Sequence, residues 1–178
     1  MIGDNDTPSA GRFLTLSGVT IRNNTADSDN TAAGDGGGIF YDRGTLNVTN
    51  CTIGGAGPAS RILRNGGGIA HAYRGGSNPQ SIVAINVDNG SIIDNRAEVD
   101  GGGIYHNETG TAAAGAVTVG STTTVAMTSN KADDDGGAVY VSGAGIATLT
   151  RANMQTNRAD HESNNDGDGG AVHSESGW

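Results

Sequence analysis

Short runs in which apolar and polar residues alternate recur along the chain. Four of them lie seven residues before a second apolar motif: Leu14-Thr-Leu16, Leu46-Asn-Val48, Ile85-Asn-Val87 and Ala147-Thr-Leu149. A fifth, Val117-Thr-Val119, lies ten residues before its motif, so about three residues are inserted there. Alternation with a period of two predicts β-strands. No segment predicts a helix, because the alanine-rich residues 111–116 are interrupted by glycine.

Two further motifs complete a repeat. The pattern apolar-x-x-Asn-x-Ala occupies residues 21–26, 92–97, 127–132 and 154–159, whereas Ile53 is followed by Gly-Gly-Ala-Gly-Pro. A glycine run behind Asp or Asn is present at residues 35–39, 65–69, 100–104, 135–139 and 168–172. The first residues of these runs are 30, 35, 35 and 33 positions apart, which is the spacing of a repeat architecture.

The three motifs predict three short strands per repeat, separated by Gly, Asn and Ser/Thr turns. Such strands are stable only when successive coils stack about 4.8 Å apart and pair with one another. We therefore predict an all-β parallel β-solenoid of about five coils of 30–35 residues, with coils ending near positions 39, 69, 104, 139 and 172. Residues 1–12 are expected to be an N-terminal extension, and residues 13–178 a single domain.

Composition agrees with a narrow core, because the chain has 31 glycines, 34% hydrophobic residues and 4% aromatic residues. A net charge of -9 argues against binding to nucleic acid or to anionic membranes. The single cysteine, Cys51, excludes an internal disulfide, and no apolar run is long enough to span a bilayer. The first residues, MIGDNDTPSA, lack the features of a secretion signal.

The combination of GGGI or GGAV with I-x-x-N-x-A, from about Phe13 to Val172, resembles the repeats of bacterial polymorphic outer membrane proteins. More broadly, it is similar to the right-handed parallel β-helix of autotransporter-type adhesins and of the pectate-lyase superfamily. The resemblance implies a secreted or surface-exposed right-handed β-helix, and it does not imply one activity.

Equivalent positions in successive coils form columns, and the column before the glycines is acidic. Its members are Asp35, Asn65, Asp100, Asp135 and Asp168. Each side chain is expected to accept hydrogen bonds from the N–H groups of its own glycine turn. The alternative is a shared calcium ion, which the nearby acids Asp133 and Asp134 favour and which the absence of the glycine-rich calcium nonapeptide opposes. No other cofactor is predicted.

Asparagines form a second column, and other asparagines lie in N-x-S/T sequons. Asn24, Asn95, Asn130 and Asn157 are expected to form a structural ladder of stacked amides. N-x-S/T sequons are present at Asn5, Asn23, Asn47, Asn50, Asn89 and Asn107. They are candidate glycosylation sites, although a chain rich in Asn, Ser and Thr produces several sequons by chance.

Two columns follow the glycine run. The first contains Phe40, Ala70, Tyr105, Tyr140 and His173 and is expected to be an aromatic stripe on the outer face of one sheet. It either contacts glycans or a neighbouring subunit, or is a set of surface aromatics covered by local loops. The second contains Tyr41, His71, His106, Val141 and Ser174. Its adjacent histidines have the chemistry of metal ligands, but the sequence shows no further ligands, so strand-end packing is the expectation.

Neither a catalytic nor a phosphate-binding constellation is present. Asp133 to Asp135 offer a carboxylate pair of the kind that glycosidases use, without a partner constellation in neighbouring coils, and no GK[ST] sequence exists. The chain is therefore not expected to be an enzyme, and a polysaccharide lyase or hydrolase is the minor alternative.

The expected function is that of an extracellular or cell-surface structural protein. The chain enters the solenoid in mid-coil and leaves it just after starting a new coil. This predicts head-to-tail stacking into a filament, or a role as part of a longer adhesin-like stalk. The alternative is a carbohydrate-binding adhesin module. Expected partners are further copies of the chain, or the remainder of a longer one, and glycans.

Overall fold

A computed structural model of the chain is an all-β solenoid, and its described residues include no helix. The structure describes residues 13–26, 35–41, 44–55, 61–62, 65–72, 83–108, 115–160 and 167–176. The predicted N-terminal extension, residues 1–12, and with it the sequon at Asn5, lies outside the described residues. The strands assemble into four parallel sheets, here called sheets 1 to 4 in the order in which the chain visits them.

The five strands of sheet 1 are β1 (Phe13–Ser17), β5 (Gly44–Thr49), β9 (Val83–Asp88), β13 (Ala116–Val119) and β17 (Ile146–Leu149). Those of sheet 2 are β2 (Thr20–Ile21), β6 (Thr52–Gly54), β10 (Gly90–Ile93), β14 (Val125–Thr128) and β18 (Ala152–Gln155). Sheet 3 has the short strands β3 (Thr25–Ala26), β7 (Arg61–Ile62), β11 (Arg96–Ala97) and β15 (Lys131–Ala132). Sheet 4 has β4 (Ile39–Phe40), β8 (Ile69–Ala72), β12 (Ile104–Glu108), β16 (Val139–Gly143) and β19 (Val172–Ser176).

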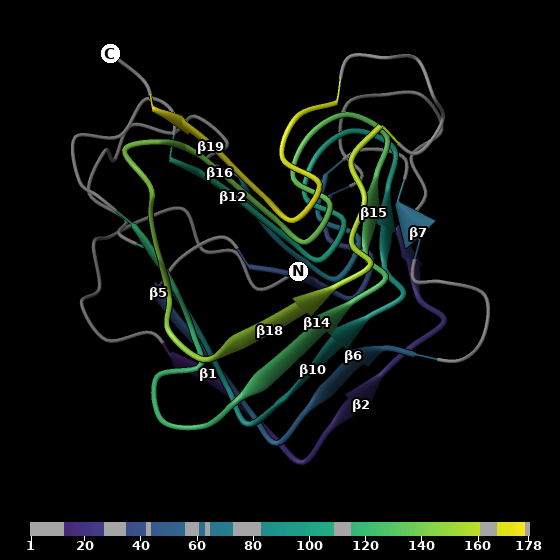
Figure 1. Ribbon diagram of the computed structural model, residues 1–178. Helices are drawn as coiled ribbons and strands as arrows, with labels where there is room; N and C mark the ends of the chain where they lie inside the picture. The colour runs from purple at the N-terminus through teal and green to yellow at the C-terminus, as the bar shows by residue number, and fades with distance from the viewer. Residues whose placement is uncertain are drawn as a thin grey trace.

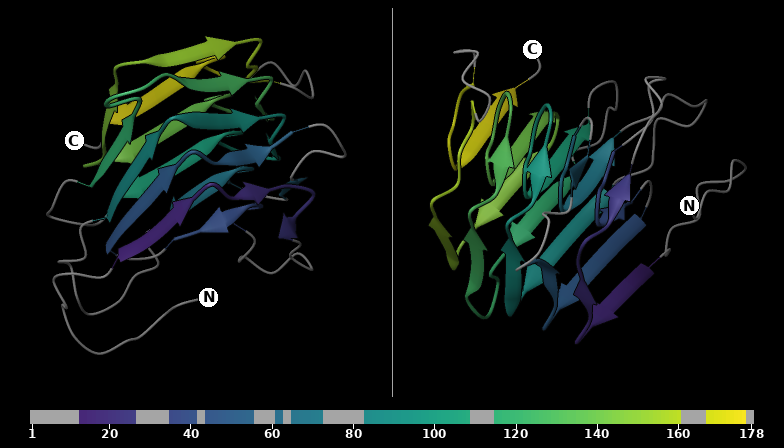
Figure 2. Two further views of the ribbon diagram at one scale, coloured as in Figure 1. Left: turned by 90° about the horizontal axis from the view of Figure 1, so that it is seen from below. Right: turned by 90° about the vertical axis from the view of Figure 1, so that its right-hand side faces the viewer.

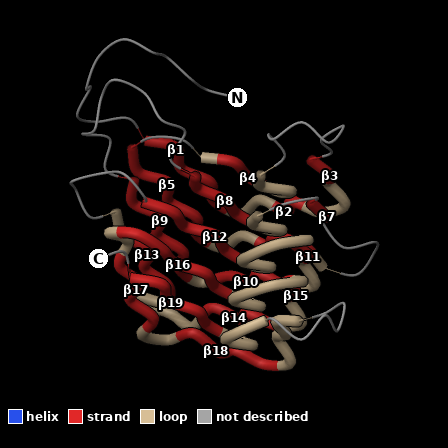
Figure 3. Tube along the Cα trace, turned by 90° about the horizontal axis from the view of Figure 1, so that it is seen from above, coloured by secondary structure: helices blue, strands red, loops and turns tan. Residues whose placement is uncertain are grey.

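Viewed along the solenoid axis, sheet 2 lies at the bottom, sheet 1 at the left, sheet 3 at the right and sheet 4 across the top (Figure 1). The chain runs counterclockwise as it advances toward the viewer, so the solenoid is right-handed, the hand that parallel crossovers prefer. From the side, strands of successive coils lie one above another from the purple to the yellow end (Figure 2). The described loops are short and lie at the corners between sheets (Figure 3).

Two predicted numbers need correction. The solenoid makes about four turns, not five, because five glycine corners enclose only four intervals between them. Each coil has four strands, not three, since the last two residues of the apolar-x-x-Asn-x-Ala motif pair with the next coil as sheet 3. A strand of two residues is too short to produce an alternating pattern that the sequence could reveal.

Residues in the left-handed region make the corners. Between sheets 1 and 2 the φ angles are +68° at Gly18, +56° at Asn50, +47° at Asn89 and +72° at Gly120. Glycine and asparagine are the residues that tolerate this region best. The asparagines of the sequons at Asn50 and Asn89 therefore have a structural explanation, because a positive φ favours asparagine or glycine at these positions.

Inward-facing apolar residues form the core. In sheet 1 the column Leu46, Ile85 and Val117 is fully buried, and the same is true of other columns facing the lumen from sheets 2 and 4. Burial of one such side chain contributes about 1.5–3 kcal/mol. The lumen is narrow, so these few residues per coil fill it, and the low hydrophobic content of the sequence is sufficient.

Asp88 forms hydrogen bonds with the residues that are inserted between Val119 and Met127. Its carboxylate accepts hydrogen bonds from the backbone N–H groups of Thr122 and Thr123, at 3.2 and 2.8 Å, and from the hydroxyls of both threonines and of Ser121. These bonds, led by that of the Thr122 hydroxyl, lower the pKa of Asp88 well below its usual range. The extra residues are thereby tied to the preceding coil.

Candidate functional site

The acidic column lies along the corner between sheets 3 and 4. In each described coil a side-chain oxygen accepts a hydrogen bond from the backbone N–H of the equivalent residue one coil further on: Asp35 from Asn65 at 3.3 Å, Asn65 from Asp100 at 3.2 Å, Asp100 from Asp135 at 3.2 Å, and Asp135 from Asp168 at 2.6 Å. The expected donors were the glycines of the same turn. The donor is instead in the next coil, so the column links coils to one another.

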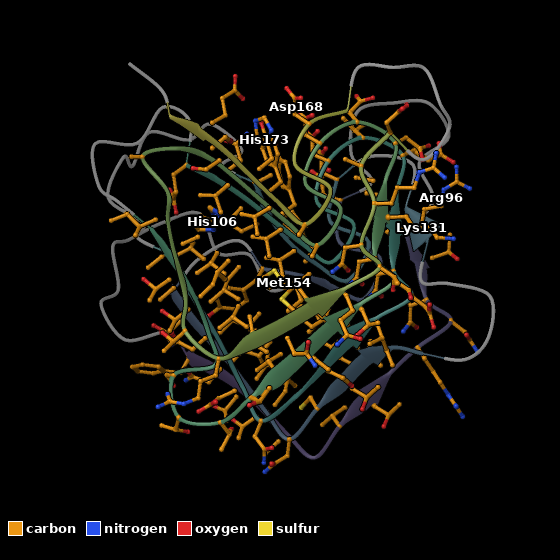
Figure 4. All side chains as sticks on the ribbon, in the orientation of Figure 1. Arg96, His106, Lys131, Met154, Asp168 and His173 are labelled. Carbon is orange, nitrogen blue, oxygen red and sulfur yellow. The ribbon has the colours of Figure 1, made fainter. Side chains whose placement is uncertain are left out.

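The pKa of Asp100 is raised within this column, chiefly by burial. Burial raises the pKa of this carboxyl to about 6; the hydrogen bond from Asp135 N–H opposes the rise, and the negative charge of Asp135 adds to it. Near the outer end of the column, Asp135, Asp168 and His173 bring ligand atoms within 4.8 Å of one another. Figure 4 shows Asp168 and His173 beside each other at this end. Two carboxylates and an imidazole fall short of the six to eight oxygens that calcium prefers, and calcium stays a prediction.

The aromatic column points away from the core cluster, as the alternation predicts, but it is not an exposed stripe. Tyr105 and Tyr140 are each only 6% exposed. Their rings stack on one another at 5.2 Å with planes 8° apart, and His173 stacks on Tyr140 at 5.3 Å. Because rings cover both faces of Tyr140 and one face of Tyr105, whose other neighbour in the column is Ala70, little of the tyrosines remains for a glycan. Phe40 and His173 are partly exposed. A glycan or subunit contact at this column stays a prediction.

Turn residues contribute to this burial, as the alternative of aromatics covered by local loops predicts. A Cβ placed on Gly101 would lie 2.8 Å from the Cβ of Tyr105, and His173 Nδ1 lies 3.7 Å from an oxygen of Asp135. The glycine turns thus stand beside the outer face of sheet 4 (Figure 1). The Tyr140 hydroxyl donates to Glu175 at 2.7 Å, and burial raises its pKa.

The asparagine ladder lies at the corner between sheets 2 and 3. Asn130 Oδ1 accepts hydrogen bonds from the N–H and Nδ2 of Asn95, and Asn157 Oδ1 accepts the same pair from Asn130. Each of these amides also donates to a backbone carbonyl of the preceding coil. Asn24 is exposed in the first coil. The residue at the Asn position of the second coil is Ala56, which lies outside the described residues.

Four of the five described sequons have asparagines that form side-chain hydrogen bonds within the fold. Asn47 Oδ1 accepts from Asn86 at 2.9 Å, and Asn50 Oδ1 accepts from Nδ2 of Asn89. Asn107 Nδ2 donates to the hydroxyl of Tyr105 at 2.9 Å. Asn23 is exposed and adopts a positive φ of 57°. Glycosylation at these sites stays a prediction.

A polar cluster in the interior of the solenoid is the candidate functional site. It consists of His71 on β8 and of His106 and Glu108 on β12, which are 1%, 0% and 1% exposed. His71 pairs with His106 across the two strands, and their ring centroids are 4.9 Å apart. One carboxylate oxygen, Glu108 Oε1, lies 3.8 Å from His71 Nδ1 and 3.6 Å from His106 Nε2. Figure 4 shows His106 inside the solenoid, between sheets 4 and 1.

Burial keeps both imidazoles neutral at physiological pH. Removal from water lowers the pKa of His71 to about 3, and the neighbouring His106 adds to this shift. Burial likewise lowers the pKa of His106 to about 4. Neutral imidazole is the form that binds metal ions or accepts a proton.

Sequence reasoning found the two histidines and missed the carboxylate. Glu108 lies two residues after His106, so in a strand it points to the same side. That signal was present, but the alternation predicts only which way a side chain points and not whether neighbouring coils bury it.

No family model, no curated protein and no solved structure matches this chain. The assignment of a parallel β-solenoid therefore rests on the strand pairing described above. Within the described residues there is no helix that is long and apolar enough to cross a membrane.

Proposed function

We propose that this protein is a structural building block that lengthens by stacking copies head to tail, with β17, β18 and β19 of one copy against β1, β2 and β4 of the next. The observation that carries the proposal is the position of two exposed apolar residues. Phe13 on β1 is 68% exposed, and Ile146 on β17 is 53% exposed. Through Thr45, Ala84 and Ala116 they are the first and last members of one column. A second copy stacked in register would bring them together.

The core columns support the same contact. Leu16 and Leu149 end one inward column, and both are only partly buried although the members between them are fully or almost fully buried. Ile21 and Met154 end a second inward column in the same way. Stacking would place each residue on the apolar side chain that continues its column, and would bury surface that is now exposed.

The unpaired edges of the terminal strands also support head-to-tail stacking. Among the described strands β1 pairs only with β5, and β18 pairs only with β14, so each leaves one edge open. An open edge of a parallel sheet favours pairing with another strand. A head-to-tail contact that adds coils along the solenoid axis does not close on itself, so it produces a filament. Placement outside the cell and a role as an adhesin-like stalk are part of the proposal and rest on the resemblance of the repeats alone.

The test uses substitutions that block one end at a time. Phe13→Asp and Ile146→Asp each place a charge at one end of the column, and Ala84→Asp places the same charge in its middle as the control. Light scattering across a concentration series, with negative-stain microscopy, is expected to show filaments for the wild type and for Ala84→Asp. Each end variant alone should be monomeric.

A mixture of the two end variants sharpens the test. The intact C-terminal end of Phe13→Asp fits the intact N-terminal end of Ile146→Asp, so an equimolar mixture should form dimers and stop there. A wild-type chain that stays monomeric at every concentration would overturn the proposal. So would filaments that persist in both end variants.

A further inference from the structure

We propose that His71, His106 and Glu108 bind one divalent transition-metal ion of the zinc type inside the solenoid. The three side chains offer two imidazole nitrogens and one carboxylate oxygen, and these atoms lie within 4.8 Å of one another. Two histidines and a glutamate are a donor set that suits Zn²⁺, with Co²⁺ as its spectroscopic substitute. The site is independent of the stacking proposed above, because it lies between the coil formed by β5 to β8 and the coil formed by β9 to β12.

The geometry needs little adjustment. Ligand atoms about 2.0–2.1 Å from a tetrahedral ion are about 3.3 Å apart. Glu108 Oε1 lies 3.6 Å from His106 Nε2 and 3.8 Å from His71 Nδ1. Small side-chain rotations would bring all three atoms to bonding distance without moving the strands, which are held in register by β8–β12 pairing.

Buried imidazole nitrogens that lack good hydrogen bonds indicate that this cluster binds a ligand. His71 Nδ1 is buried and has no hydrogen-bond partner among the described residues, and neither buried ring nitrogen of His106 makes a hydrogen bond of good geometry there, its backbone neighbour Gly115 included. Buried polar atoms in native proteins are nearly always hydrogen-bonded or bound to a metal. Coordination would use one nitrogen of each ring.

Two glycines make room for the cluster. A Cβ at Gly115 would overlap Glu108 Oε1 and would lie 2.8 Å from His106 Nε2. A Cβ at Gly145 would lie 2.8 Å from the His106 ring. The next member of the histidine column is Val141, which is 1% exposed and belongs to the apolar core. Because an apolar residue fills this position one coil further on, the fold does not require histidine here.

Bound metal would link β8 to β12 through side chains as well as through the backbone. An ion that binds the folded state and not the unfolded one raises the free energy of unfolding. The ion would therefore cross-link the coil formed by β5 to β8 to the coil formed by β9 to β12. His71 lies in the coil formed by β5 to β8, and in this coil the apolar-x-x-Asn-x-Ala motif is degenerate.

The experiment uses the full chain after treatment with a chelator. Zn²⁺ and Co²⁺ are titrated separately, followed by calorimetry, by the visible absorption of tetrahedral Co²⁺ and by thermal unfolding. One ion per chain, tetrahedral Co²⁺ absorption and a higher Tm are expected. Glu108→Gln should weaken binding by more than about 100-fold, because the loss of even an indirect partner of a ligand costs 10–100-fold.

A double variant guards against misfolding, and another one tests the competing cluster. His71→Val with His106→Val copies Val141, so it should fold and should lose both the Co²⁺ absorption and the Tm increase. His173→Ala removes the imidazole from the partly exposed group of Asp135, Asp168 and His173, and this variant should bind the metal like the wild type. Absence of binding to the wild-type chain would overturn the proposal, as would binding that survives Glu108→Gln or is lost in His173→Ala.

Discussion

Asn95 and Asn130 lie one coil apart, and both the backbone N–H and the side-chain Nδ2 of Asn95 donate to Oδ1 of Asn130, at 3.2 and 3.0 Å. Both residues are fully buried. The side-chain oxygen of Asn130 thus satisfies the backbone N–H of Asn95 at this corner. Asn95 Oδ1 itself has no hydrogen-bond partner among the described residues, and the equivalent position one coil earlier, Ala56, lies outside them.

Asn130→Ala should lower the free energy of unfolding by about 2–4 kcal/mol, because it leaves the Asn95 N–H and the Ile92 carbonyl without their partner in a buried corner. Denaturant unfolding measures the change, in the Phe13→Asp background so that assembly does not contribute. Asn24→Ala, at the exposed end of the same column, is the control and should change stability by less than about 0.5 kcal/mol. Equal effects of the two substitutions would contradict the ladder.

Gly102→Ala should be destabilising by about 2–3 kcal/mol, because neighbouring coils approach too closely for a side chain. The added Cβ would overlap the carbonyl oxygen of Lys131 and would lie 2.5 Å from that of Gly137. Gly170 occupies the same column at the end of the solenoid, where a Cβ would lie 3.6 Å from Asn157 O. Gly170→Ala in the same monomeric background should therefore be nearly neutral, and a comparable loss in both variants would disprove the close-approach explanation.

Asp100→Asn should stabilise the protein at neutral pH. The folded state raises the pKa of Asp100 to about 6, above its unfolded value, so the protonated form is favoured on folding. The contribution of Asp100 is present at low pH and is lost as the pH rises from about 4 through 6. Asparagine keeps the acceptor for Asp135 N–H and is the residue that already occupies the column at Asn65.

The gain from Asp100→Asn is expected to be about 1 kcal/mol at pH 7, because part of the side chain remains solvated and solvent screens the repulsion. Thermal unfolding from pH 4 to pH 7 measures it, and the difference in Tm between variant and wild type should widen with pH. Asp168→Asn, an exposed member of the column, serves as the control. A difference that shrinks as the pH rises would contradict the assigned direction.

Asp88→Ala should increase the local mobility of the inserted residues around Thr122 and Thr123. The carboxylate holds the N–H groups of Thr122 and Thr123, so hydrogen exchange at these two amides should accelerate while exchange in β9 and β13 stays unchanged. Because the folded pKa of Asp88 is lowered, this contribution is present above the unfolded pKa and is lost as the pH falls through the folded one. Amide exchange by NMR measures the effect, and equal acceleration in the two strands would show a global effect instead.

The repeat by itself determined the main outline of the solenoid. Period-two runs such as Leu46-Asn-Val48 assign inward and outward side chains, and the glycine runs mark a corner where positive φ and close approach exclude most other residues. These are local properties, because they depend on backbone sterics and on strand geometry alone. The parallel stacking of coils then follows, since strands this short need partners from the next coil.

Tertiary structure alone decided three features. Sheet 3 forms from two residues such as Arg96 and Ala97, which pair only because the next coil presents the same corner in register. Tyr105 points outward and is nevertheless buried, because a neighbouring ring and a glycine turn cover it. Glu108 meets His71 only through the register of β8 and β12. Alternation fixes the direction of a side chain, whereas its burial and its chemical neighbours depend on what the adjacent coils place around it.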